Sequence, residues 1–237
     1  MVERYYRRAA GNSGPNPFRC EGFVRGGTIA GHGCEPVAID TLPPFLRALL
    51  VTDGTVTKML EAYFWEPVVV DTLRQEFITA EAEIPWIEIA AGDRIMVRRA
   101  RLRGADSGKH YAHAFSVIRT ELIPPMFRQR LIDREIGIGA LIRDSGLESY
   151  REVMEVGVEV GPGIGPDTSP DDTSPDLVAD GSRSGAEGLR PAAAPKGREQ
   201  ETGRDGISSG VVRTYRIIIA GAPVILISET FPLQLYR

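Results

Sequence analysis

The stretch "LRALLVTDGTVTKMLEAYFWEPVVVDTLRQEF", residues 46–77, contains two helix patterns and a strand pattern in immediate succession. Its first residues have the apolar spacing of an amphipathic helix, which Asp53-Gly54 ends, and a second short helix begins at Thr55. The β-branched residues of 66–79 then predict a strand that carries one arginine, Arg74. This order predicts a helix-turn-helix unit that leads directly into a sheet.

The remainder of the chain contains five more strand patterns and a second pair of short helices. The six predicted strands are 66–79, 95–103, 111–121, 149–160, 211–220 and 224–231. Between the third and fourth strands, "IPPMFRQRLIDREIGIGALIRDSG" has prolines at a helix start, a glycine break and a closing Gly146. Short links suit hairpins, so we predict an α+β fold with a six-stranded, mainly antiparallel sheet and two helix-turn-helix units.

Two segments are expected to lie outside this regular fold. Residues 1–40 are rich in glycine and show no sustained period, so we predict a loosely ordered N-terminal segment. Residues 161–210 contain no aromatic side chain and repeat the pentad DTSPD in tandem, a composition typical of a disordered loop. Because the strands after this loop cannot be stable alone, we predict a single domain over 41–237 that the loop interrupts.

Charge and cysteine content argue against several classes of protein. The chain has 28 basic and 32 acidic residues, a formal net charge of -4, which gives no basic field for nucleic acid. Cys20 and Cys34 have neither the spacing nor the partners of a zinc site or a disulfide framework. The N-terminus lacks the apolar core of a signal peptide, and the apolar run 217–228 is too short for a bilayer. We expect a soluble, cytoplasmic protein.

Glu229 is the first candidate for a functional site. Alternation along the last strand places it on the same face as Ile225, Ile227 and Phe231. A carboxylate in apolar surroundings must be paired, protonated or directed into a cavity that a ligand fills. An internal salt bridge to an arginine such as Arg99 or Arg213 and a role in ligand binding are both consistent with this pattern.

Arg74 is the second candidate, and it allows the same choice. Alternation along the strand puts it on one face with Val68, Val70, Thr72 and Glu76. The simplest interpretation is an exposed cation that pairs with Glu76 or with an acid on the next strand. The alternative is a site for a ligand carboxylate, which a guanidinium can hold through two parallel hydrogen bonds.

Other polar residues give weaker indications. The run "RIMVRRARLR" could add positive potential near an anionic ligand through Arg94, Arg98 and Arg99, although such a run is more often the solvated face of a strand. His110 and His113 stand three apart in a predicted strand, which places them on opposite faces and favours surface or packing roles over metal binding.

Two glycine breaks precede predicted helix starts. Asp53-Gly54-Thr55-Val56 and Ile136-Gly137-Ile138-Gly139 each leave backbone N–H groups that could receive an anion. Ordinary helix capping is the commoner use of such turns. The second break lacks the third glycine of a dinucleotide fingerprint and follows a helix, so a dinucleotide fold is not indicated.

The blocks "LLVTDGTVTKMLEAYFWEPVVVDTLRQEF", "IGIGALI", "SYRE" and "GAPVILISETFP" resemble the chorismate pyruvate-lyase family, in particular its bacterial and archaeal branch of uncharacterised relatives. The resemblance covers most of 41–160 and 211–236. It leaves the N-terminal segment and the loop 161–210 unmatched. It implies a six-stranded antiparallel sheet with two helix-turn-helix flaps over a buried site.

The resemblance also implies a set of site residues. Arg74 matches the arginine that holds the ring carboxylate, and Glu229 matches the glutamate that meets the ring hydroxyl. Backbone N–H groups of Val56 and Ile138, one from each flap, assist the arginine. The first flap is one residue longer than in the best-known enterobacterial form, so Thr55 is an alternative to Val56.

The activity that the resemblance implies is elimination of pyruvate from chorismate to give 4-hydroxybenzoate. Aromatisation drives this reaction, so no metal, nucleotide or other cofactor is expected, and Arg74 and Glu229 are the expected catalytic residues. The expected partner is a small-molecule substrate, without nucleic acid or membrane, bound by a monomer. The alternative is a non-catalytic binding or sensor module, since the effector domains of one class of bacterial regulators resemble the same fold.

Overall fold

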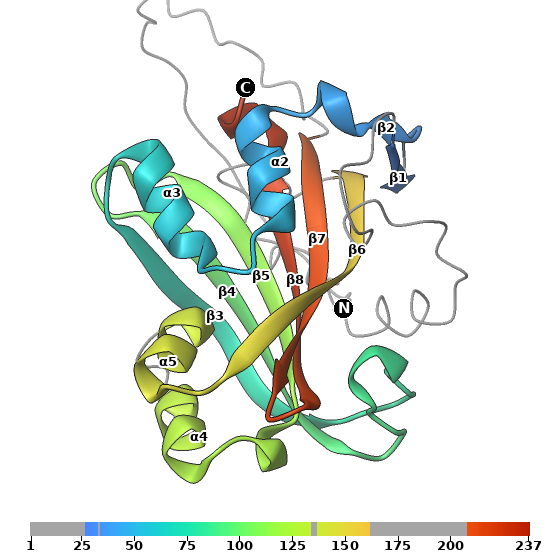
Figure 1. Ribbon diagram of the computed structural model, residues 1–237, viewed down its shortest axis with the longest axis vertical. Coiled ribbons are helices and arrows are strands. Elements are labelled where there is room, and N and C mark those ends of the chain that lie inside the picture. Colours follow the sequence, from blue (N-terminus) through green and yellow to red (C-terminus); the bar gives the residue numbers. More distant parts are fainter. Residues whose placement is uncertain (1–26, 33, 134–136, 162–207) are drawn as a thin grey trace, which may run out of the picture.

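The computed structural model describes residues 27–32, 34–133, 137–161 and 208–237, and it confirms the α+β class (Figure 1). The α-helices are α2 (Pro44–Val51), α3 (Val56–Phe64), α4 (Pro125–Ile132) and α5 (Ile138–Ser145), and short 3-10 helices cover Ile39–Thr41, Pro85–Ile87, Thr120–Leu122 and Leu233–Leu235. The strands are β1 (Thr28–His32), β2 (Val37–Ala38), β3 (Val68–Thr79), β4 (Arg94–Gly104), β5 (His110–Ile118), β6 (Ser149–Gly161), β7 (Ser208–Ile219) and β8 (Ala222–Pro232).

All of these strands belong to one sheet of eight strands, in the order β2-β1-β6-β7-β8-β5-β4-β3. Neighbours are antiparallel except β1 and β6, which are parallel. The predicted number of six strands is therefore wrong, because β1 and β2 extend the sheet beyond β6. Both come from the glycine-rich N-terminal segment, whose first 26 residues lie outside the described part of the chain.

Gly31 explains why the sequence of β1 did not read as a strand. A Cβ atom at this position would lie 2.2 Å from the carbonyl oxygen of Cys34, so only glycine allows the turn from β1 to pass this close. The strand has five residues and β2 has two, which is too short for a period-two pattern to be recognised.

The two predicted helix pairs are present. The first helix pair, α2 and α3, is joined by the link Thr52–Thr55, and the second helix pair, α4 and α5, has residues 134–136 of its link outside the described residues. Prolines open α2 and α4, and α5 ends at Gly146, which has a left-handed φ of 63°. No helix in the described ranges is long and apolar enough to cross a bilayer.

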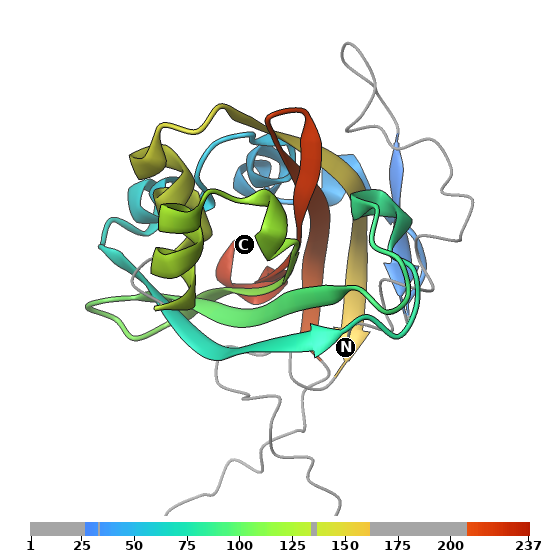
Figure 2. The ribbon, with the colours of Figure 1, turned by 90° about the horizontal axis from the view of Figure 1, so that it is seen from below.

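The sheet is strongly curved, and both helix pairs lie on its concave side (Figure 2). The first helix pair packs on one end of this face through Leu46, Leu49, Leu50 and Leu60, and the second packs on the other end through Phe127, Leu131, Leu141 and Ile142. Burial of each of these leucine side chains stabilises the folded state by about 1.5 to 3 kcal/mol. A third apolar cluster, which includes Ile84, Ile87 and Ile89, covers part of the opposite face.

The expected loop at about 161–210 lies outside the described residues, apart from its two ends. Gly161 and Ser208 are paired as the last residue of β6 and the first of β7. The chain thus leaves and re-enters the sheet at opposing positions of one antiparallel pair.

Candidate active site

A cavity of about 370 Å³ lies between the concave face of the sheet and the two helix pairs. The starts of α3 and α5 form its roof, where a Cβ atom on Gly139 would lie 3.3 Å from Cγ2 of Thr55. The first turns of α3 and α5 therefore meet directly above the sheet. The volume lies within the range of small-molecule sites, about 300 to 1,000 Å³.

The floor of this cavity owes its space to small side chains. Ala100 of β4, Ala114 of β5 and Ser116 of β5 all line it. Arg98 stands on one side of them and Glu229 on the other, since Arg98 pairs with Ser116 and Glu229 pairs with Ala114. With β5 between their strands, the two backbones are separated by about 10 Å across the sheet. The two charged side chains therefore flank the floor of small side chains.

Arg98 is the arginine at the floor of the cavity. It is only 2% exposed, and its Nη2 donates to the hydroxyl of Thr72 over 2.7 Å. Its position on β4 follows the apolar alternation Met96, Ala100 and Leu102, all of which are buried. A guanidinium among these residues presents a planar set of donors in surroundings of low polarity, which suits a carboxylate ligand.

Arg74 lies elsewhere, so the structure does not bring the two predicted catalytic residues together. The pairing of β3 with β4 shifts between Thr72 and Arg74, which is a β-bulge at Leu73. A bulge inserts one residue and reverses the alternation that follows. Arg74 therefore points to the convex side, where its side chain is 62% exposed and pairs with Glu76 at 2.9 Å. Among the described residues, the cavity lining includes Arg98 but not Arg74.

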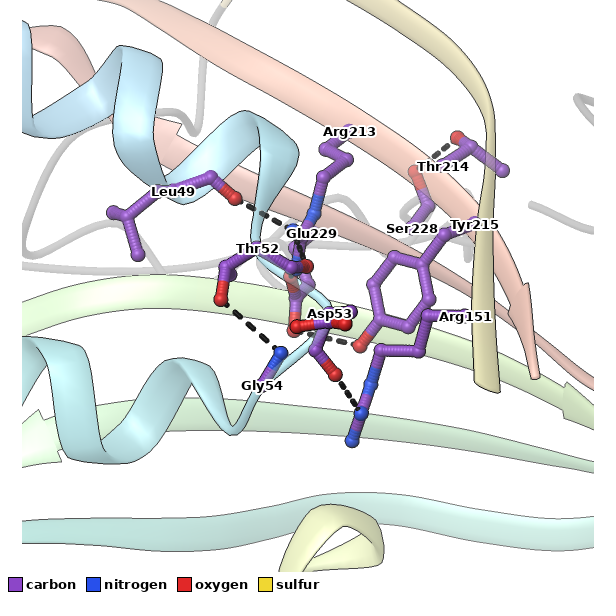
Figure 3. Close-up of polar contacts among 10 residues, drawn as sticks. All are labelled: Leu49, Thr52, Asp53, Gly54, Arg151, Arg213, Thr214, Tyr215, Ser228 and Glu229. Atoms are coloured by element: carbon purple, nitrogen blue, oxygen red, sulfur yellow. Dashed lines mark hydrogen bonds and ion pairs between the residues drawn. The ribbon is translucent and has the colours of Figure 1, made fainter. Parts of the chain in front are cut away.

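Glu229 is paired with an arginine, and it also lines the cavity. It is 6% exposed and lines the cavity, and Nη2 of the fully buried Arg213 lies 2.7 Å from its Oε2 (Figure 3). The hydroxyl of Tyr215 donates to Oε1 over 3.1 Å. Burial, together with the nearby carboxylate, raises the pKa of the Tyr215 hydroxyl, so Tyr215 acts as a neutral donor.

Val56 and Ile138 also line the cavity, each as the first residue of its helix. Backbone N–H groups in a first helical turn have no partner within the helix and favour anions. Thr55 precedes Val56 with extended backbone angles and lines the cavity as well, so either residue can face a ligand.

The rim of the cavity is basic. Counting the floor, the lining contains four basic and two acidic side chains: Lys58, Arg98, Arg143, Arg151, Glu61 and Glu229. Lys58 lies 2.6 Å from Glu61, and this hydrogen bond holds the pKa of Glu61 below its usual range despite its partial burial. The excess of positive charge favours an anionic ligand.

The other polar residues considered from sequence lie outside this cavity. Arg94 stacks over the ring of Phe77 at 4.7 Å, and Arg99 faces the convex side opposite Phe115. The rings of His110 and His113 are 6.2 Å apart, so the expectation of opposite faces is wrong. A second bulge, at Tyr111, brings them together. Burial, with smaller effects of His110 and Arg101, lowers the pKa of His113 to about 4.

Comparisons with known proteins confirm the family resemblance. Residues 50–162 match the model of the family described as "Chorismate pyruvate-lyase Rv2949c-like". A chorismate pyruvate-lyase of Mycobacterium leprae (strain TN) is 32% identical over 113 residues, which is 48% of this chain and 54% of the relative. The match thus spans about half the length of that relative. A chorismate pyruvate-lyase of Mycobacterium tuberculosis (strain ATCC 25618 / H37Rv) is 24% identical over 196 residues, 81% of each chain.

Among solved structures, PhnF from Mycobacterium smegmatis is similar with a TM-score of 0.49 and 9% identity, over 79% of this chain and 67% of that one.

Proposed function

We propose that this relative of the chorismate pyruvate-lyases eliminates pyruvate from chorismate and forms 4-hydroxybenzoate in the cavity beneath its two helix pairs. The observation that carries the proposal is the placement of Arg98 and Glu229 on either side of a floor of small side chains. In this proposal the domain has the chorismate lyase-like fold, and the two helix pairs are the flaps over its site.

The substrate ring lies over Ala100, Ala114 and Ser116 in this proposal. Its carboxylate is held by the guanidinium of Arg98 and by the first backbone N–H groups of α3 and α5. Its hydroxyl donates to Glu229. Arg98 thereby takes the part that the sequence resemblance gave to Arg74, because Arg98 is buried at the cavity and Arg74 is exposed on the other face.

The charge of the lining fits the two carboxylates of chorismate. Arg98 is at the floor, whereas Lys58, Arg143 and Arg151 belong to the rim, so in this proposal the ring carboxylate and the enolpyruvyl carboxylate contact different cations. Two acidic side chains leave an excess of two positive charges in the lining. A dianion is the complement of such a site.

The chemistry requires little from the protein beyond orientation and one proton movement. The ether C–O bond breaks, the ring carbon that carries the hydroxyl loses its proton, and the enolpyruvyl methylene gains a proton to become the methyl of pyruvate. Aromatisation supplies the driving force. Glu229 lies at the hydroxyl-bearing end, where a fixed carboxylate can orient the hydroxyl and assist transfer of the neighbouring proton.

The test is to incubate the purified full chain with chorismate and to quantify pyruvate and 4-hydroxybenzoate by chromatography. We expect equal amounts of both products, at a rate above that of chorismate alone. Binding of 4-hydroxybenzoate without release of pyruvate identifies a sensor module instead. The absence of both binding and turnover contradicts the proposal.

A further inference from the structure

Arg213 is a fully buried side chain that contacts both the candidate site and the link of the first helix pair (Figure 3). We propose that Arg213 is a positioning residue, which with Tyr215 orients Glu229 toward the ligand hydroxyl and connects Glu229 to the Thr52–Thr55 link. This inference rests on the proposed function, because it assigns the ligand hydroxyl to Glu229.

On the site side, each carboxylate oxygen of Glu229 has its own donor. Nη2 of Arg213 lies 2.7 Å from Oε2, and the Tyr215 hydroxyl lies 3.1 Å from Oε1. The guanidinium carbon of Arg213 lies 4.5 Å from the centre of the Tyr215 ring, so the two donors also support each other. A carboxylate has about four acceptor positions, so two bonds fix its plane and leave acceptor capacity for a ligand hydroxyl.

On the helix side, Nη1 of Arg213 donates to two carbonyl oxygens at the end of α2, those of Leu49 at 2.5 Å and Thr52 at 3.0 Å. Carbonyl groups of a last helical turn lack partners within the helix and attract cations. The Thr52 hydroxyl in turn accepts from the backbone N–H of Gly54 over 3.1 Å. One guanidinium thus ties Glu229 to the residues that set where α3 begins.

Stability alone explains this arrangement poorly. A buried ion pair loses the hydration of both charges, and its net contribution to folding is often small. In addition, Nε of Arg213 is buried without a hydrogen-bond partner among the described residues. The guanidinium leaves its Nε–H without a partner in the described part of the chain but donates from Nη1 and Nη2 to Leu49, Thr52 and Glu229. Such an arrangement is better explained by its effect on the orientation of Glu229 than by stability.

The experiment compares two ligands that differ only in the hydroxyl, 4-hydroxybenzoate and benzoate. Calorimetric titration gives the ratio of their dissociation constants for the full chain, for Arg213→Lys, for Tyr215→Phe and for Glu229→Gln. The matched control is Arg216→Lys, because Arg216 lies on the same strand in a comparable pair with Glu152, at 2.7 Å, outside the cavity lining. Melting temperatures show which variants are folded.

We expect the parent to prefer 4-hydroxybenzoate by about 10- to 100-fold, the range for a hydrogen bond to a charged group. Arg213→Lys should lose most of this preference while its affinity for benzoate stays at the parental level, since lysine cannot hold three partners in one fork. Tyr215→Phe and Glu229→Gln should behave in the same direction, and Arg216→Lys should match the parent.

A folded Arg213→Lys variant that keeps the full preference overturns the inference. Equal weakening of both ligands also overturns it, because that result indicates a structural role only. If Arg213→Lys does not fold, Tyr215→Phe decides by the same two criteria. A parent that binds neither ligand contradicts the proposed function itself, and this failure is visible before any variant is compared.

Amide hydrogen exchange tests the connection to the helix link separately. In the parent, 4-hydroxybenzoate should slow exchange at Gly54, Thr55 and Val56 more than benzoate does. In Arg213→Lys the two ligands should protect these amides equally. A hydroxyl-dependent difference that persists in this variant shows that the signal does not pass through Arg213 and overturns that part of the inference.

Discussion

Arg98 and Arg74 are arginines on neighbouring strands, but one side chain is buried and the other is exposed. Arg98 is 2% exposed at the cavity floor, whereas the Arg74 side chain is 62% exposed and paired with Glu76. We expect Arg98→Lys to weaken 4-hydroxybenzoate binding by about 1.5 to 3 kcal/mol, because a lysine loses the bidentate contact with a carboxylate.

Arg74→Lys is the matched control for this substitution and should bind like the parent. Calorimetric titration of both variants measures the difference, and circular dichroism confirms that each is folded. The reverse result, with Arg74→Lys impaired and Arg98→Lys unaffected, returns the carboxylate contact to Arg74.

His113 gives a residue-scale prediction about pH. Its pKa is lowered to about 4 in the folded chain, below the ordinary value of 6.5, so the unfolded chain takes up the proton first as the pH falls. The free energy of unfolding should therefore decrease as the pH is lowered from about 6.5 to about 4, by at most about 3 kcal/mol from this residue. His113→Gln should flatten this part of the curve.

Urea unfolding at several pH values between 4 and 7 measures the effect. The difference between parent and variant should be largest at neutral pH and should vanish near pH 4. A difference that is the same at every pH shows that His113 contributes by packing and does not titrate in this range.

At the scale of secondary-structure elements, the meeting of α3 and α5 over the cavity is the feature most open to test. A Cβ atom on Gly139 would lie 3.3 Å from Cγ2 of Thr55, which is closer than ordinary contact. We expect Gly139→Ala to push the helix starts apart and to weaken 4-hydroxybenzoate binding by about 1 kcal/mol, the lower end of overpacking costs.

Thr55→Ser removes the methyl group that Gly139→Ala meets and keeps a hydroxyl at the N-cap position. The double variant should therefore recover most of the lost affinity in the same titration. If Thr55→Ser does not compensate, the loss in Gly139→Ala arises from another contact of α5.

The elements also show where sequence patterns are sufficient and where they are not. Proline and glycine positions correctly predicted both helix pairs, and β-branched runs predicted six of the eight strands. The bulges at Leu73 and Tyr111 could not be predicted, because an inserted residue leaves the local composition of a strand unchanged. Each bulge reversed a face, and the first of them misplaced Arg74.

A signal for Arg98 was nevertheless present in the sequence. Arg98 shares its alternation phase with Met96, Ala100 and Leu102, whereas Arg99, Arg101 and Arg103 share the other phase. Between Met96 and Leu102, Arg98 is the one cation in this phase, and a cation that alternates with apolar residues indicates a buried role. The pair of Glu229 with Arg213 was accessible in a similar way, since both lie in one hairpin and face each other in its register.

At the scale of the whole molecule, the segment between β6 and β7 is expected to be dispensable. Its ends are paired across the hairpin at Gly161 and Ser208, and its composition does not favour burial. Deletion of 166–205 with a short flexible link should leave the melting temperature and the turnover of chorismate nearly unchanged. A large fall in melting temperature in differential scanning calorimetry shows that the segment packs on the domain.

The contact between Thr55 and Gly139 has a kinetic consequence for the proposed reaction. The two helix starts lie over the cavity, and the product retains the carboxylate and hydroxyl that hold it in place, so we expect 4-hydroxybenzoate to leave slowly. Rapid mixing with excess chorismate should then yield a burst of pyruvate close to one equivalent per chain, followed by a slower steady rate. Dissociation of the product, and not bond breaking, would thus limit the steady-state rate.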